Sequence, residues 1–198
     1  MNENKYATAG WLAIAGAILI LPVIPGAIII DILFEKGVFS APFAGAFLLL
    51  SVTQSLLVIY AFYRFKGYLN ELHEFHGTDL LITVIVIGVI VITTIGVVAR
   101  LTLWAGAPDP VRFGFIALMV VVGIPLGVLS VIFGIKLLEL KDSGVALMKP
   151  YAYLNIVAGA LFATFILAPI GLLVGSVGDL LMGLIMLRKG PEVQPEFV

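Results

Sequence analysis

Long apolar segments alternate with short polar ones along almost the whole chain, and single charged residues mark most of the boundaries. The hydrocarbon core of a bilayer is about 30 Å thick and takes roughly 20 helical residues to cross. Several of the apolar segments reach that length. The pattern therefore predicts membrane-spanning helices at residues 7–30, 43–63, 80–99, 113–135, 151–167 and 170–187.

The last two predicted spans come from one apolar stretch, Tyr151 to Leu187, in which Asp179 is the only charged residue. As a single helix this stretch would be about 56 Å long, much longer than the hydrocarbon core. It is therefore either a steeply tilted helix that protrudes from the membrane or a hairpin that turns at Leu167 to Gly171.

The distribution of basic residues favours the hairpin, because cytoplasmic loops are enriched in Lys and Arg. Six spans place eight of the 11 basic residues on the side of the two termini, whereas five spans would divide them six to five. We therefore expect six spans, with both termini in the cytoplasm. The eight are Lys5, Arg64, Lys66, Lys136, Lys141, Lys149, Arg188 and Lys189, and the other three are Lys36, Arg100 and Arg112.

The composition supports the same fold class. Hydrophobic residues make up 62% of the chain and charged residues only 12%, about half of the roughly 25% found in soluble domains. We predict an all-α integral membrane protein of the cell membrane, with one domain over 1–190 that is a bundle of six transmembrane helices. The alternative is five helices, the last one long and kinked. Pro108 and Pro110 predict a turn within 101–112, and 191–198 is predicted to be a short flexible tail.

Charge and cysteine content exclude several classes of protein. The formal net charge is −1 and the basic residues are scattered, which argues against nucleic acid as a partner. No cysteine is present, so disulfides, thiolate metal sites and a cysteine nucleophile are excluded. The lipid bilayer is the partner that the sequence implies.

Aromatic residues lie near the predicted ends of the spans, as expected of side chains that favour the membrane interface. On the side of the termini they are Tyr6, Trp11, Tyr60, Tyr63, Tyr151 and Tyr153, and on the other side Trp104 and Phe113.

Small residues follow one face of two spans at helical spacing, and such faces let helix backbones approach closely in lipid. The interpretation we favour is packing within the chain, with the fourth span against the last one. The alternative is a contact between copies in a homo-oligomer. The residues are Gly123, Gly127, Ser130 and Gly134 in the fourth span, and Gly171, Gly175, Gly178 and Gly183 in the last.

Asp179 is predicted near the middle of the membrane, where burying a carboxylate costs about 2.5 to 3.5 kcal/mol. It is either a proton carrier, cation ligand or counter-ion, or a structural residue that is neutral and hydrogen-bonded to a neighbouring helix. Gln54 and Thr94 are predicted at a similar depth. Asp31 and Arg100 end two spans on the outer side, where they either form an ion pair or act as separate interfacial anchors.

The two histidines, His73 and His76, would share one face of a helix and could hold a metal ion together with Asp79. A solvated helix at the membrane surface is the interpretation we favour, and the spacing of the zinc-protease motif is not present. The sequence contains no P-loop, dinucleotide fingerprint or nucleophile elbow. We therefore expect no cofactor and no enzyme activity.

The function that these observations favour is that of a non-catalytic assembly or accessory component, as a homo-oligomer or with a partner membrane protein. The alternative is a small channel or transporter for protons, cations or a small solute that uses Asp179 and Gln54. A membrane enzyme that uses His73 and His76 is the third hypothesis. A dry, filled core around Asp179 would favour the first, and a hydrated cavity that reaches one surface would favour the second.

Overall fold

Six helices make up the protein in the computed structural model, which describes residues 4–38, 40–140 and 146–188. They are α1 (Ala7–Glu35), α2 (Ala41–His73), α3 (Asp79–Trp104), α4 (Asp109–Leu138), α5 (Met148–Ala163) and α6 (Ala168–Leu187). The described ranges contain no strand, and the predicted all-α fold class is confirmed. The predicted tail at 191–198 and the basic residues Lys141 and Lys189 lie outside these ranges.

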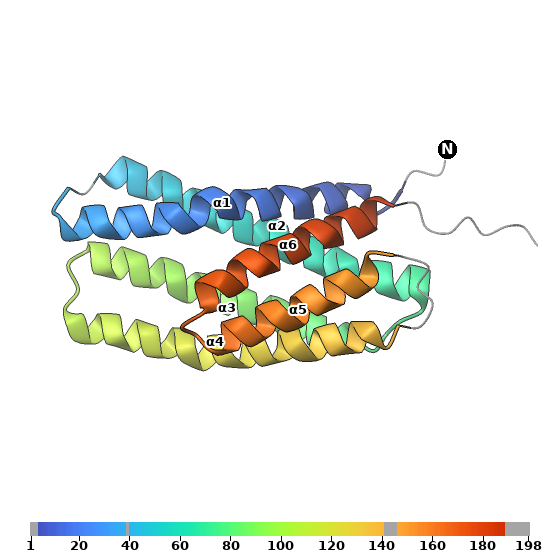
Figure 1. Cartoon of the computed structure of the whole chain (residues 1–198). Helices are drawn as coiled ribbons and strands as arrows, with labels where there is room; N and C mark the ends of the chain where they lie inside the picture. The colour runs from blue at the N-terminus through green and yellow to red at the C-terminus, as the bar shows by residue number, and fades with distance from the viewer. Residues whose placement is uncertain (1–3, 39, 141–145, 189–198) are drawn as a thin grey trace, which may run out of the picture.

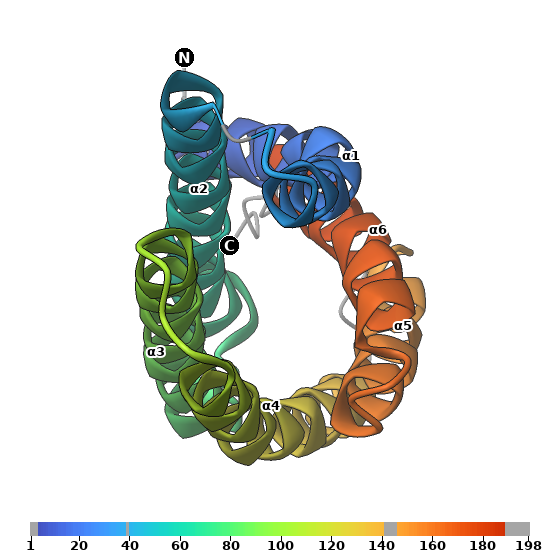
Figure 2. The same cartoon turned by 90° about the vertical axis from the view of Figure 1, so that its left-hand side faces the viewer.

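The helices stand in the order of the sequence and form a ring (Figure 1, Figure 2). Each helix packs against the next one, and α6 packs against α1 and closes the ring. The two ends of the chain therefore meet, and the side-chain amide of Asn4 donates a hydrogen bond of 2.9 Å to the carbonyl oxygen of Met186. We call this end the terminal end. The opposite end carries the α1–α2 and α3–α4 connections (Figure 1).

The long apolar stretch near the C-terminus is a hairpin, as the basic residues predict. α5 ends at Ala163 and α6 begins at Ala168, so the break comes a few residues before the predicted Leu167 to Gly171. Phe165 in the turn has a left-handed backbone conformation, with φ of +59°.

Five of the described helices are long and apolar enough to cross a membrane, and α5 is not among them. Its 16 residues extend for only about 24 Å, and the α5–α6 turn ends short of the opposite end of the ring (Figure 1). A turn at such a depth has to satisfy its own backbone. The N–H groups of Thr164, Phe165 and Ala168 donate to the carbonyl oxygens of Leu161, Phe162 and Phe165 at 3.3, 3.1 and 3.1 Å.

Some helices extend beyond the predicted spans. α2 continues through polar residues as far as His73, so the segment after residue 63 is largely helical. α3 and α4 both extend into the predicted turn at 101–112, which shortens to residues 105–108. Pro110 lies in the first turn of α4, where the N–H that proline lacks has no helical partner in any case.

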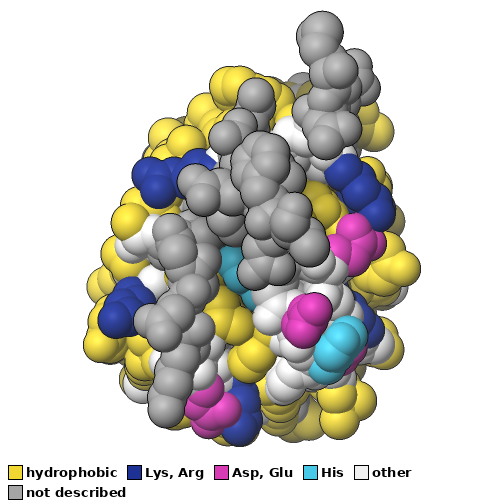
Figure 3. All heavy atoms as spheres, turned by 90° about the vertical axis from the view of Figure 1, so that its right-hand side faces the viewer, with side chains coloured by type: hydrophobic (Ala, Val, Ile, Leu, Met, Phe, Trp, Pro, Cys, Tyr) yellow, Lys and Arg dark blue, Asp and Glu magenta, His cyan; other side chains and the backbone are white. Residues whose placement is uncertain are grey.

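Aromatic rings fill the centre of the ring of helices toward the terminal end. The ring centroids of Phe62 and Phe133 are 5.2 Å apart, and those of Phe65 and Tyr151 are 5.3 Å apart. Tyr68 stacks on Phe65 at 5.7 Å. We call these five residues the aromatic cluster. Outside this core, Lys and Arg side chains lie around the edge of the terminal end among apolar ones (Figure 3).

The aromatic residues predicted at the interface of the terminal end fall into two groups. Tyr6 and Tyr151 are 3% and 1% exposed and belong to the core, rather than to the interface. Trp11, Tyr63 and Tyr153 are more than half exposed, as interfacial side chains are. Depth along a helix is readable from the sequence, but it does not show which face of the helix turns inward.

The glycine face of α4 packs against another helix, as predicted, but the partner is α5 rather than the last helix. A Cβ atom added to Gly127 would lie 2.6 Å from the backbone nitrogen of Ala163 and 2.7 Å from the carbonyl oxygen of Gly159. The hairpin explains the difference, because α5 returns beside α4 before α6 continues around the ring. Gly123, Ser130 and Gly134 also lie against α5.

The glycines of α6 pack against two neighbouring helices, α5 and α1. A Cβ atom added to Gly171 would lie 3.0 Å from the carbonyl oxygen of Ala158 in α5. One added to Gly183 would lie 2.6 Å from the carbonyl oxygen of Gly10 in α1, so this pair closes the ring. Gly175 and Gly178 face α5 at ordinary contact distances.

Replacing Gly127 with Leu is expected to destabilise the protein by at least about 2 kcal/mol. Overpacking costs about 1–3 kcal/mol, and here the new side chain meets backbone atoms of α5 that cannot move aside alone. Gly114→Leu in the same helix is the matched control, because a Cβ atom at Gly114 has nothing within 4 Å. Thermal unfolding in detergent compares the two variants, and equal Tm values would contradict the packing.

Candidate functional site

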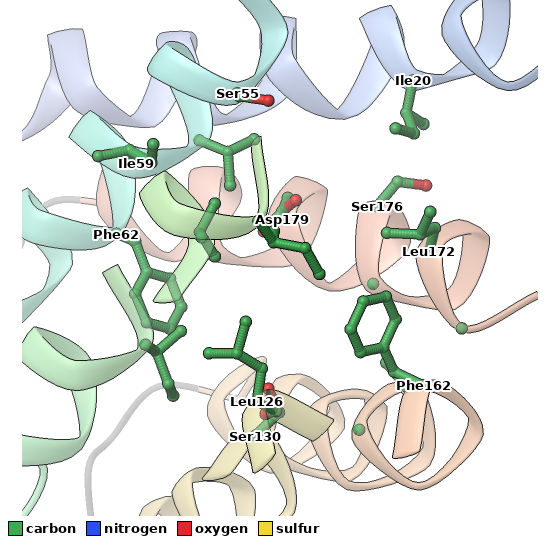
Figure 4. Close-up of a pocket in the computed structure, with 18 of the residues that line it drawn as sticks. Ile20, Ser55, Ile59, Phe62, Leu126, Ser130, Phe162, Leu172, Ser176 and Asp179 are labelled. Carbon is green, nitrogen blue, oxygen red and sulfur yellow. Dashed lines mark hydrogen bonds between the residues drawn. The ribbon is translucent and has the colours of Figure 1, made fainter. Parts of the chain in front are cut away.

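A cavity of about 280 Å³ lies in the middle of the ring (Figure 4). All six helices contribute to its wall, which consists mainly of apolar side chains such as Ile20 of α1 and Phe162 of α5. The polar lining residues are Gln54 and Ser55 of α2, Thr93 of α3, Ser130 of α4, Asn155 of α5, and Ser176 and Asp179 of α6.

The cavity is closed on the side of the terminal end. In α2 to α6 its lining residues adjoin core residues that lie further toward that end, as Asp179 adjoins Met182 in α6. Toward the opposite end the ring is filled less. The structure describes α3 and α4 in full. In α3 no residue between Ile85 and Ala99 is buried, and in α4 no residue before Gly123 is buried. We therefore expect the cavity to be approached from the opposite half of the ring.

Asp179 turns its side chain toward the cavity and is partly exposed there (Figure 4). Within the described residues its carboxylate accepts no hydrogen bond and forms no ion pair. Gln54 lines the same cavity, but its amide donates to the carbonyl oxygen of Gly16 at 3.5 Å. A carboxylate without a partner in a low-dielectric interior is costly, so Asp179 gains most in this cavity from a cation or a hydrogen-bond donor.

Three other polar side chains of the cavity donate to carbonyl oxygens of their own helices. Ser130 Oγ donates to the Leu126 carbonyl oxygen at 2.9 Å, Ser176 Oγ to that of Leu173 at 2.8 Å, and Asn155 Nδ2 to that of Tyr151 at 2.9 Å. The hydroxyl and amide oxygens keep lone pairs that can accept. The cavity therefore presents acceptors, which suit a cation or a ligand with N–H or O–H groups.

Thr93 rather than Thr94 supplies the polar lining of α3. Thr94 is exposed and donates to the carbonyl oxygen of Ile90 at 2.8 Å, whereas Thr93 donates to Ser55 Oγ at 3.4 Å. Depth along the span predicts the level of the cavity correctly, but neighbouring residues of a helix point about 100° apart, so depth alone does not distinguish Thr93 from Thr94. Ser176 was also missed, although its position three residues before Asp179 places both on one face.

The predicted outer ion pair between Asp31 and Arg100 does not form. The ion pair found here among the described residues joins Arg112 and Glu35 at 3.8 Å. The Arg100 guanidinium group instead lies 5.0 Å from the ring centre of Phe47, a cation–π contact. Asp31 and Arg100 still interact electrostatically, but as separate residues without a direct contact.

His73 and His76 do not converge on a metal site. α2 ends at His73 and Glu74 is left-handed, with φ of +48°, so the two rings do not share a helix face. The His73 ring packs 5.4 Å from that of Tyr68, and His76 Nδ1 lies 3.3 Å from Asp79 Oδ2. In the part of the chain that the structure describes, no three His, Cys, Asp or Glu side chains are close enough to hold a metal ion.

Comparison of the chain with family models, with curated proteins and with solved structures gives no match. The argument about function therefore depends on the cavity itself, on its Asp179 carboxylate and on the acceptors around it.

A single cysteine at position 176 is expected to react with a small methanethiosulfonate reagent, because Ser176 lines the approachable cavity. The natural chain has no cysteine, so labelling reports on one position. Ala152→Cys is the control, since Ala152 is 0% exposed in the core, and it should react much more slowly. Mass spectrometry after timed exposure gives both rates. Equally slow labelling of the two variants would show that the cavity is sealed.

Proposed function

We propose that the protein is a small transporter for a proton, a metal cation or a small organic cation, with Asp179 as the cation-binding group. The observation that carries the proposal is a carboxylate that faces a central cavity and has no basic partner among the described residues. A bound cation offsets the cost of holding this charge within the membrane. The acceptor oxygens of Ser130, Asn155 and Ser176 add further ligands for the same charge.

The shape of the ring favours a transporter over an open channel. The aromatic cluster fills the terminal end, and we infer that the cavity is reached from the opposite half, where fewer residues of α3 and α4 are buried. Passage across the membrane therefore requires the cluster to move. From the distribution of basic residues we infer that the terminal end faces the cytoplasm, so that the cavity is approached from the outer side.

The assembly role that the sequence favours has less support from the packing. Its positive basis was the two glycine faces, and these faces contact α5 and α1 of the same chain. They are consequently not available to a second copy or to a partner protein. We therefore give preference to transport, and we continue to expect no catalysis.

Asp179→Asn is expected to reduce cation uptake into reconstituted vesicles at least about tenfold. The substitution keeps the size of the side chain but removes its charge, and a hydrogen bond to a charged group is worth about 1.5–3 kcal/mol, where 1.4 kcal/mol is a factor of ten. Asp109→Asn is the control, because Asp109 is an exposed carboxylate at the start of α4.

Uptake is measured for protons with a pH-sensitive dye, and for potassium and methylammonium with radiolabels. The parent and the Asp109→Asn protein should transport one of these cations, with the Asp179→Asn protein strongly impaired but equally thermostable. If neither the parent nor the variants exceed empty vesicles for any of the three cations, the transport proposal is wrong.

A further inference from the structure

A second cavity, of about 240 Å³, lies at the terminal end beside α2. Its wall is formed by the part of α2 that continues past the apolar segment, together with Tyr6 just before α1. Tyr63, Arg64, Lys66 and Glu71 are the lining residues of α2 that matter for its chemistry. This cavity shares no lining residue with the cavity around Asp179.

Two basic side chains of this cavity have no acidic partner among the described residues. The Lys5 ammonium group donates to both carboxylate oxygens of Glu71 at 2.8 Å, so the charge of Glu71 is already balanced. Arg64 reaches only the carbonyl oxygen of Lys5, at 3.5 Å, and Lys66 only the hydroxyl group of Thr83, at 3.4 Å. The cavity therefore keeps a net positive charge from Arg64 and Lys66.

Arg64 also holds a donor that the chain leaves unused. Its Nε–H group is buried and makes no hydrogen bond within the described residues, and its guanidinium group is held over the Tyr6 ring, 5.3 Å from the ring centre. Tyr6 is 3% exposed, and its hydroxyl group lies beside the Glu71 carboxylate. Buried donors are normally satisfied, so the unused Nε–H group of Arg64 indicates an acceptor from outside the chain.

The cavity lies at the depth where lipid headgroups are expected. The apolar segment of α2 ends at Tyr63, which is 63% exposed, as interfacial aromatic side chains are. Leu56 and Tyr60 are 59% and 43% exposed, and their spacing places them on the same face of α2 as Arg64. A lipid can therefore hold its headgroup at Arg64 and lay its acyl chains along Leu56 and Tyr60.

We propose that this cavity binds the phosphate group of an anionic phospholipid. The planar guanidinium group of Arg64 matches two phosphate oxygens, and Lys66 supplies a second positive charge. Anionic lipids are concentrated in the cytoplasmic leaflet, where the basic residues place the terminal end. The site is independent of the transport proposal and needs no role for Asp179.

Native mass spectrometry of the full chain in a neutral detergent tests the site. Dioctanoyl phosphatidylglycerol is expected to bind more tightly than dioctanoyl phosphatidylcholine. Arg64→Gln and Lys66→Gln should each weaken phosphatidylglycerol binding about fivefold, and added salt should weaken it further. Lys36→Gln removes an exposed cation at the opposite end and should leave the affinity unchanged.

Lys66 is partly exposed, so Lys66→Gln tests the site without changing a buried side chain if Arg64→Gln lowers the stability of the fold. Inorganic phosphate at millimolar concentration should displace the lipid only in part, because it has no acyl chains. Equal affinity for the two lipids would overturn the proposal. So would unchanged affinity for phosphatidylglycerol in a variant that combines Arg64→Gln with Lys66→Gln. Complete displacement by inorganic phosphate would replace the lipid with free phosphate as the ligand.

Discussion

Close contact between helix backbones at glycines holds the ring together. Helices in lipid gain little from the hydrophobic effect, so their association depends on van der Waals contact and hydrogen bonds. Gly127 meets Gly159 where α4 contacts α5, and Gly183 meets Gly10 where α6 contacts α1. The α5–α6 turn lies short of the opposite end of the ring (Figure 1), so these contacts keep Asp179 in the wall of the cavity.

The cavity follows from a change in side-chain size along the ring. At the terminal end, the large rings of the aromatic cluster fill the space that the six helices enclose. One or two turns further on, α5 and α6 carry Gly159, Gly175 and Ser176 at the same inner face. These small side chains cannot fill the same width, and the space they leave is lined by the groups that can accept hydrogen bonds.

Length and charge predict the parts of this structure that depend on position along the membrane normal. They predict the long apolar helices, the hairpin and the meeting of the two ends of the described chain. They do not show which way a side chain points around its helix, and for this reason Thr94 is predicted where Thr93 lines the cavity, and Tyr151 is predicted at the interface although it is buried. The helix that packs against each glycine face also could not be predicted from the sequence, because the order of the helices around a ring is a property of the folded chain.

Ring closure also determines when the cavity can exist during synthesis. α6 is made after the other five helices, and it has to return to α1, the earliest of the six. Contacts between such distant parts of a chain form late in folding. Until α6 arrives, the nascent protein has neither the wall that completes the cavity nor the carboxylate within it.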